Sequence, residues 1–191
     1  EMTGINILSL SERQVPGNGV AGKDAKLPAN SQVDKSRTIT VEFDANARGP
    51  FFALQRFAQA AVAGGHPAAA VNILSMAAHC GQSFLAPYSA SKAALANVTK
   101  NAAQALRSHK IRVNGINCGW MDTPGEDETQ RKYHRADDGW LAEAEARLPM
   151  GMLVKPDHVA ALASYMLSPD SGVMTGALVD FDQNVAGAYP E

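Results

Sequence analysis

The chain has 191 residues, of which 46% are hydrophobic, and its formal net charge at pH 7 is −2. This length and apolar content suffice for one folded domain with a buried core, so we predict a single domain over residues 1–191. The small net charge argues against a surface for nucleic acid or anionic membranes, and no apolar run approaches the roughly 20 residues that cross a bilayer.

The two cysteines, Cys80 and Cys118, do not form a close metal-ligand pair and imply no disulfide framework. No metal site is therefore expected. The N-terminus carries no basic-then-apolar secretory leader, so the expected location is the reducing cytoplasm.

The first clear element is a helix over residues 44–63, followed by a buried strand over residues 71–75. Asp44 is a candidate N-terminal cap for the helix, and Gly64-Gly65 would end it. The strand is a short apolar run rich in β-branched residues, and it follows a turn-forming Gly-Gly-His-Pro sequence.

Helices and strands continue to alternate along the rest of the chain. We expect an Ala-rich helix over 88–108, a strand over 111–117, a charged segment with short helices over 124–150, a helix over 157–167 and a strand over 177–181. This alternation implies right-handed crossovers and a parallel sheet that helices cover on both faces.

Tyr88 and Lys92 are four residues apart at the start of the Ala-rich helix, and Ser75 ends the strand before it. Residues i and i+4 share a helix face, so the Lys92 ammonium would lie beside the Tyr88 phenol. A neighbouring cation lowers the pKa of a phenol from its ordinary value near 10, which would suit Tyr88 to proton transfer at a carbonyl or alcohol oxygen. Ser75 would lie at the sheet edge where open α/β sheets bind ligands, and could hydrogen-bond the same oxygen.

Several separate motifs, in this order, resemble the short-chain dehydrogenase/reductase family. They are the segment 43–52 around Asn46, the strand end 72–75, the Tyr88–Lys92 run thirteen residues after Ser75, the strand and turn 111–124, and the segments 155–160 and 174–177. The resemblance covers about residues 40 to 185.

The resemblance implies an α/β fold with a Rossmann-like doubly wound parallel sheet in three α/β/α layers. It also implies an oxidoreductase that uses NAD or NADP to interconvert a secondary alcohol and a ketone. Tyr88 would be the general acid in reduction and the general base in oxidation. Lys92 would lower the Tyr88 pKa and bind the nicotinamide ribose. Ser75 would polarise the substrate carbonyl, and Asn46 would hold a water that links Lys92 to solvent.

The same resemblance assigns further contacts. The expected cofactor contacts are Tyr88, Lys92, Gly119, Met121 (through its backbone) and Thr123. The candidate substrate contacts are His79, Trp120 and Trp140, although each could serve only packing or solvation. The segment 124–150 would be a substrate-binding lid. Its charges and aromatic residues favour a small polar substrate such as a polyol, sugar or hydroxy acid, although a solvated charged face fits equally well. Cys118, which replaces a proline of the family, is expected to pack as a small hydrophobic residue.

Residues 1–40 match the family poorly, so the N-terminal dinucleotide-binding half looks incomplete. The family's Gly-rich turn is missing, because Thr3-Gly4 begins one but Leu8 stands where a glycine is needed. Residues 17–22 could be a distorted second turn or a Gly-rich surface loop. A truncated chain, a divergent member, or a sequence from which internal stretches are missing would each explain this, and we favour the third.

The missing turn keeps a second class of function open, a non-catalytic regulatory or scaffold relative that has lost dinucleotide binding. Members of the family commonly form tetramers through two long helices, which here are 44–63 and 88–108. The expected partners are therefore a small-molecule substrate and further copies of the chain in a homotetramer or homodimer, with neither nucleic acid nor membrane.

Overall fold

The structure is a computed structural model that describes residues 5–7, 36–79 and 85–188. Within these ranges, a parallel sheet has the strand order β1-β2-β3-β4. Its strands are β1 (Ile5–Ile7), β2 (Ala68–Ser75), β3 (Ile111–Cys118) and β4 (Leu178–Phe181). The α-helices are α1 (Ser36–Phe43), α2 (Gly49–Gly64), α3 (Ala86–Leu106), α4 (Pro124–Tyr133), α5 (Trp140–Ala146) and α6 (Pro156–Leu167).

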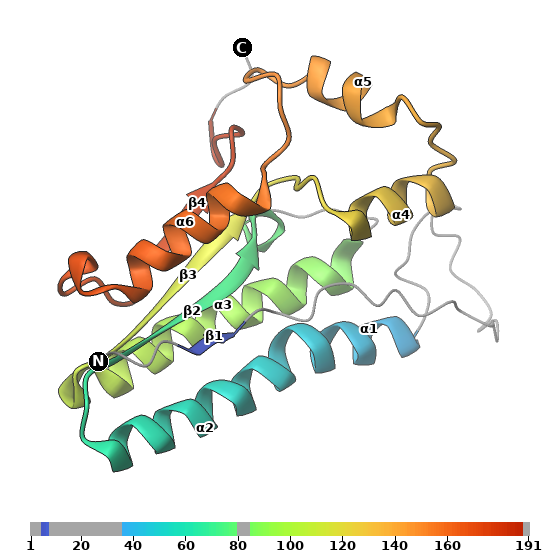
Figure 1. Cartoon of the computed structure of the whole chain (residues 1–191). Coiled ribbons are helices and arrows are strands. Elements are labelled where there is room, and N and C mark those ends of the chain that lie inside the picture. The colour runs from blue at the N-terminus through green and yellow to red at the C-terminus, as the bar shows by residue number, and fades with distance from the viewer. Residues whose placement is uncertain (1–4, 8–35, 80–84, 189–191) are drawn as a thin grey trace.

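Helices cover the sheet on both faces, as Figure 1 shows. On one face, Leu54 and Phe57 of α2 and Ala103 of α3 pack against alternate residues of β2 and β3. On the other face, Val159 and Met166 of α6 pack in a cluster with Val71 of β2 and with Ile116 and Cys118 of β3. The predicted three-layer α/β/α fold with a parallel sheet is confirmed. None of the helices in the described ranges combines the length and apolar character needed to cross a bilayer.

The first long helix begins earlier than the sequence predicts. Phe43 is helical, with φ −71° and ψ −36°, so Asp44 is not an N-terminal cap. Instead α1 runs into a π-helical segment, η2 (Asp44–Arg48), and then into α2, while the Asp44 carboxylate accepts a hydrogen bond from Arg48 at 3.2 Å. The predicted end is confirmed, because Gly65 takes the left-handed conformation with φ 66°.

The strand β2 also begins three residues before the prediction, at Ala68. Alanine has little intrinsic preference for strands, so Ala68, Ala69 and Ala70 gave no strand signal. All three are buried in the sheet, and Ala68 and Ala70 pack in the cluster with α2 and α3, so burial decides their conformation. The helix α3 begins at Ala86, with Pro87 in its first turn, where a missing N–H costs nothing.

The first 40 residues contribute a strand that the sequence reading did not find. β1 (Ile5–Ile7) pairs in parallel with β2, with Ile5 opposite Ala70. The interpretation of residues 17–22 and the explanations offered for the poor N-terminal match fall outside the described residues.

The carboxyl ends of β2, β3 and β4 meet at one edge of the sheet. Ser75 is opposite Cys118 in the pairing of β2 with β3, and Cys118 is opposite Phe181 in the pairing of β3 with β4. Since neighbouring strands lie about 4.8 Å apart, side chains from all three strand ends can meet there.

Candidate active site

Lys92 connects the start of α3 to the end of β2. Its side chain is buried at 3% exposure, and Nζ donates a hydrogen bond to the carbonyl oxygen of Ile73 at 3.2 Å. The same Nζ lies 5.6 Å from the centre of the Tyr88 ring, within the range of a cation–π contact. The helical spacing thus brings a buried ammonium onto the phenol, two residues from the end of the strand that carries Ser75.

Ser75 is the last residue of β2 and also begins the turn that follows. Its backbone is extended, and its Oγ accepts a hydrogen bond from the Ala77 N–H at 3.2 Å, which caps the 3-10 turn η3 (Met76–Ala78). Because this contact uses Oγ as an acceptor, the hydroxyl proton remains available for another oxygen.

Asn46 lies in the π-helical segment η2 and is 4% exposed. Its Nδ2 donates to Glu42 Oε2 at 2.7 Å and to Ser91 Oγ at 3.2 Å, and Ser91 Oγ donates to the carbonyl oxygen of Tyr88 at 2.7 Å. Asn46 is therefore tied through Ser91 to the turn of α3 that carries Tyr88 and Lys92. Single π-helical turns inside α-helices often occur at functional sites.

Glu42 and Ser91 are residues of this network that the sequence reading did not single out. Glu42 lies one helical turn before Asn46, a spacing at which side chains meet. That signal was lost because the helix was expected to begin at Asp44. Ser91 is fully buried, and serine at such a position in an Ala-rich helix carries no pattern of its own.

The turn after β3 holds the expected cofactor contacts Gly119, Met121 and Thr123. Gly119 donates its N–H to the carbonyl oxygen of Phe181 at 3.0 Å, and a Cβ at this position would overlap the Asp182 carboxylate. Thr123 begins α4, where its Oγ1 accepts a hydrogen bond from the Glu126 N–H at 3.0 Å.

Met121 pairs with Val154 in an isolated parallel bridge. The bridge uses the carbonyl of Trp120 and the N–H of Asp122, both bonded to Val154 at 2.9 Å. In a parallel bridge the central residue's own N–H and C=O point away from its partner, so those of Met121 point to the opposite side. The structure thus leaves the backbone groups of Met121 directed away from Val154.

Cys118 behaves as a packed thiol at the end of β3. It is 5% exposed and belongs to the apolar cluster that packs under α6. Burial raises the pKa of its thiol to about 11, although the charge of Lys92 acts in the opposite direction. The thiol is therefore protonated at neutral pH and is not a nucleophile.

Two tryptophans connect the strand edge to the predicted lid 124–150. The rings of Trp120 and Trp140 lie 6.2 Å apart at a tilt of 30°. Trp120 is 41% exposed and donates its indole N–H to Glu126 Oε1 at 2.7 Å, whereas Trp140 is 8% exposed and packs in a cluster with Leu153. Of the two candidate substrate contacts, Trp120 presents the more accessible ring.

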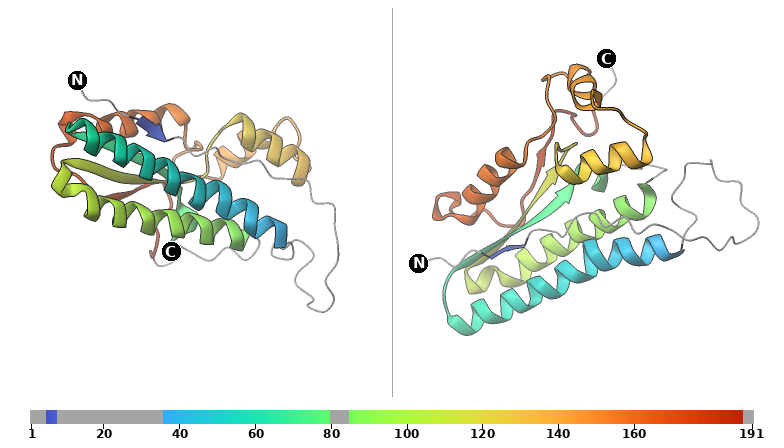
Figure 2. Two further views of the ribbon diagram at one scale, coloured as in Figure 1. Left: turned by 90° about the horizontal axis from the view of Figure 1, so that it is seen from below. Right: turned by 45° about the vertical axis from the view of Figure 1, so that its right-hand side comes forward.

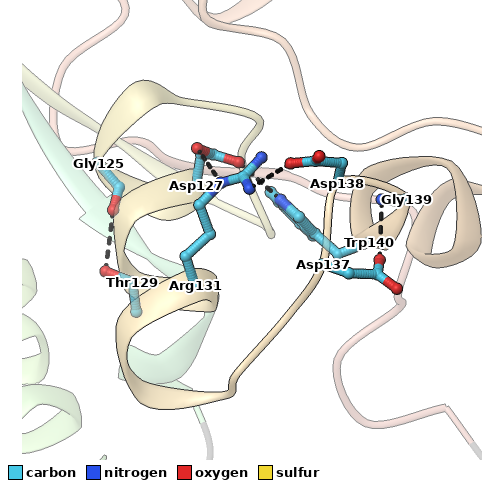
Figure 3. A network of polar contacts seen from close by, with 8 residues as sticks. All are labelled: Gly125, Asp127, Thr129, Arg131, Asp137, Asp138, Gly139 and Trp140. Atoms are coloured by element: carbon cyan, nitrogen blue, oxygen red, sulfur yellow. Dashed lines mark hydrogen bonds and ion pairs between the residues drawn. The ribbon is translucent and has the colours of Figure 1, made fainter.

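An ion-pair network holds α4 against α5 (Figure 3). Asp127 accepts hydrogen bonds from Arg131 Nε at 2.8 Å and from the Trp140 indole N–H at 2.7 Å, and these bonds lower the pKa of its carboxyl group. Arg131 also bonds Asp138 at 2.6 Å, ahead of α5. His134 lies exposed at the end of α4.

His79, the remaining candidate substrate contact, follows η3 directly. Its Nε2 lies 2.7 Å from Asp180 Oδ1 on β4 and 2.9 Å from Asn117 Nδ2 on β3. Neither Asp180 nor Asn117 could be identified from the sequence, because their contacts with His79 span 101 and 38 residues of the chain.

Comparison with known proteins identifies the family. Residues 19–183 match the family model described as enoyl-(acyl carrier protein) reductase. The chain is also 34% identical over 158 residues to (3R)-3-hydroxyacyl-CoA dehydrogenase of Canis lupus familiaris, a match that covers 83% of this chain. This protein belongs to the short-chain dehydrogenase/reductase family. The resemblance seen in the sequence motifs is thereby confirmed.

Other members of this family are similar over a comparable share of the chain. Galactitol 2-dehydrogenase of Agrobacterium fabrum is 32% identical over 146 residues, which cover 73% of this chain and 56% of that enzyme. A gluconate 5-dehydrogenase of Burkholderia cenocepacia, solved in complex with NADP and tartrate, has a TM-score of 0.68 and 22% identity, covering 81% of this chain and 58% of that one, and it shows the shared fold.

The chain is shorter than these relatives. It spans 57% of the length of the Canis lupus familiaris enzyme that it matches. The activity of the whole protein is therefore a proposal that must be argued from its own residues.

We predict that Cys118 reacts slowly with iodoacetamide at pH 8. A rise in the thiol pKa from 9.0 to about 11 lowers the thiolate fraction about 100-fold, so labelling of the native protein should be slower than that of the denatured protein by at least this factor. Peptide mass spectrometry separates Cys118 from Cys80. Equal labelling rates in the native and denatured states would contradict the buried, protonated thiol.

Proposed function

We propose that this protein is an oxidoreductase that uses NAD or NADP to interconvert a secondary alcohol and a ketone. The observation that carries the proposal is the buried Lys92 ammonium, held by the Ile73 carbonyl and lying over the Tyr88 ring. A buried charge is costly unless a function or a partner offsets it, and here it sits beside a group able to transfer a proton.

Tyr88 is the proton-transfer group of this mechanism. In reduction its phenol O–H gives a proton to the developing alkoxide oxygen, and in oxidation the phenolate takes the proton from the alcohol. The positive charge of Lys92, 5.6 Å from the ring centre, stabilises the phenolate form.

Ser75 is assigned the task of orienting the substrate oxygen. Its Oγ accepts the Ala77 N–H at 3.2 Å, so its own proton is available to another acceptor. A hydrogen bond from this hydroxyl to the substrate carbonyl polarises it and fixes it beside Tyr88.

Asn46 is assigned to a proton path behind Lys92. Its Nδ2 is engaged with Glu42 and Ser91, which fixes the orientation of the amide. We therefore propose that Oδ1 of Asn46 holds the water that would connect Lys92 with solvent. The Glu42 carboxylate accepts the hydrogen bond from Asn46 Nδ2 at 2.7 Å, and so holds the Asn46 amide in η2, just before α2 begins.

The residues around this site fit the nicotinamide end of a dinucleotide. Lys92 would bind the ribose hydroxyls, and the outward-facing backbone of Met121 and the hydroxyl of Thr123 would bind the carboxamide. A cofactor contact at Gly119 stays a prediction, because the Asp182 side chain fills the space beside its Cα. When bound, the dinucleotide supplies or accepts the hydride. The structure of the gluconate 5-dehydrogenase contains NADP, which supports this assignment by relationship.

We further propose a small polar substrate, such as a polyol, a sugar or a hydroxy acid. Galactitol 2-dehydrogenase and gluconate 5-dehydrogenase are named for substrates of this kind. The exposed ring of Trp120, fixed by its bond to Glu126, offers a rigid amphipathic surface at the entrance of the lid. Turnover of a 3-hydroxyacyl-CoA would instead place the protein with its relative from Canis lupus familiaris.

Assembly into a homodimer or homotetramer is proposed from the face formed by α2 and α3, which run side by side in Figure 2. A groove of about 360 Å³ between these helices is lined almost entirely by apolar side chains: Phe51, Leu54, Ala58, Val98, Ala102, Ala105 and Leu106, with Gln55 and Asn101. Phe51 and Phe52 are 45% and 50% exposed. A second copy of the chain would cover this surface by a two-fold contact, in which each α2 and α3 meets its counterpart.

The reducing cytoplasm is the proposed location. A buried free thiol at Cys118 is compatible with that compartment, since it has no need of an oxidising environment.

Replacing Tyr88 by Phe should abolish turnover without loss of the fold. With galactitol, gluconate and a 3-hydroxyacyl-CoA as test substrates and NAD or NADP as cofactor, we expect kcat to fall at least about 100-fold, the usual contribution of a general acid or base. Tyr165→Phe is the matched control, because Tyr165 lies exposed on α6, outside the segment 124–150, and its kcat should be unchanged.

A Tyr88→Phe variant with the turnover rate of the wild type would contradict the proposed role of Tyr88 in proton transfer. Lys92→Met should lower kcat as well, because it removes the charge beside the phenol.

Replacing Phe51 by Glu should dissociate the assembly. A charge placed in the apolar groove cannot be buried against a second copy without a large cost. Light scattering coupled to size exclusion should report a lower mass for Phe51→Glu, while Val173→Glu, at a residue 95% exposed in the turn after α6, should keep the mass of the wild type. A monomeric wild type would contradict the proposed interface.

A further inference from the structure

Three polar side chains outside the proposed proton-transfer set meet at the carboxyl edge of the sheet. His79 Nε2 lies 2.7 Å from Asp180 Oδ1, and Asn117 Nδ2 donates to the same oxygen at 2.7 Å. Asn117 and Asp180 are opposite each other in the pairing of β3 with β4, so their side chains emerge on the same face of the sheet. The cluster thus joins two strands to the turn that follows the third.

His79 Nε2 lies 2.7 Å from Asp180 Oδ1 and 2.9 Å from Asn117 Nδ2. A carboxylate only accepts hydrogen bonds, so we assign the proton to His79 Nε2, and the Asn117 amide then donates to Asp180 alone. Burial alone would raise the pKa of Asp180, but the hydrogen bonds from Asn117 and His79 outweigh it and hold the pKa below its ordinary value. Asp180 is therefore a carboxylate at neutral pH that accepts two hydrogen bonds.

Parts of this arrangement cost free energy. Asn117 is fully buried, and its Oδ1 has no hydrogen-bond partner among the described residues. Such an orphaned acceptor costs free energy, as does an aspartate within a short strand. An exposed His–Asp pair recovers little stability, and these two side chains are 36% and 42% exposed.

The cluster is connected to Ser75 through a single short turn. His79 donates its backbone N–H to the Met76 carbonyl at 3.0 Å, which closes η3 at one end. At the other end, Ser75 Oγ accepts the Ala77 N–H at 3.2 Å. The three-residue turn η3 thus lies between the Ser75 hydroxyl and the residue that carries the His79 ring.

We propose that Asp180 is a positioning residue for Ser75, acting with Asn117 through His79. The carboxylate holds the imidazole, the imidazole holds η3, and η3 sets the direction of the Ser75 hydroxyl. This role rests on the proposed function in one respect, since the direction of that hydroxyl affects turnover only if Ser75 contacts the substrate.

The first test follows the turn itself and needs no turnover. Amide hydrogen exchange of Ala77 is measured by NMR in the full chain for the wild type, Asp180→Ala and Asp180→Asn. We expect exchange at Ala77 to accelerate at least about tenfold in Asp180→Ala, and less in Asp180→Asn, whose amide oxygen can still accept the His79 N–H. Asp170→Asn is the matched control, because Asp170 is an exposed carboxylate in η6 (Pro169–Ser171), and it should leave Ala77 unchanged.

The second test asks whether the effect reaches catalysis through Ser75. Asp180→Ala is combined with Ser75→Ala, and kcat is measured with galactitol or gluconate. We expect Asp180→Ala to lower kcat about 5- to 20-fold in the wild-type background and less than twofold in the Ser75→Ala background, with dinucleotide affinity unchanged in both. Asp180→Asn should lower kcat less than Asp180→Ala does.

The outcomes separate the two proposals. An Ala77 amide that exchanges at the wild-type rate in Asp180→Ala overturns the positioning role, whether or not the protein is active. An equal loss of kcat in both backgrounds overturns it as well. A wild type without turnover, combined with accelerated exchange at Ala77, would overturn the proposed function and retain the link from Asp180 to the turn.

Discussion

The buried ammonium of Lys92 is the interaction on which the rest of the site depends. It ties α3 to β2 through the carbonyl of Ile73, and it places a positive charge over the ring of Tyr88. Desolvating an ammonium is expensive, so the surrounding structure must supply fixed polar partners. The same turn of α3 is also bonded to Asn46, whose Nδ2 donates to Ser91 Oγ, while Ser91 Oγ donates to the Tyr88 carbonyl.

The sheet converts this local pairing into a site. Parallel strands place all their carboxyl ends at one edge, so β2, β3 and β4 deliver Ser75, the turn at Gly119 and Asp180 to the same region although more than 100 residues separate the first from the last. Helix α6 packs on one face of the sheet and α2 with α3 on the other, so the helices cover the two faces (Figure 1). The segment 124–150 lies near this edge through Trp140, whose ring is 6.2 Å from that of Trp120.

The fold class and the Tyr88–Lys92 contact could be predicted from sequence because both follow from short-range periodicity. Helical spacing brings residues four apart together, and a β-branched run marks a buried strand wherever it occurs. The start of the first helix could not be predicted from sequence, because Asp44 has the residue type of a cap but lies in a continuous helix. The strand residues Ala68 to Ala70 were missed because tertiary burial overrides the low strand preference of alanine. The His79–Asp180 contact joins residues 101 apart and leaves no local pattern.

The most direct test of the account is equilibrium binding of the reduced dinucleotides to the full chain, followed by nicotinamide fluorescence. If Lys92 holds the nicotinamide ribose, the wild type should bind NADH or NADPH, and Lys92→Met should weaken that binding at least about tenfold, a loss of about 1.4 kcal/mol. Lys100→Met, at an exposed lysine two turns further along α3, should bind as the wild type does. A wild type that binds neither NADH nor NADPH would contradict the account and favour a non-catalytic relative of the family.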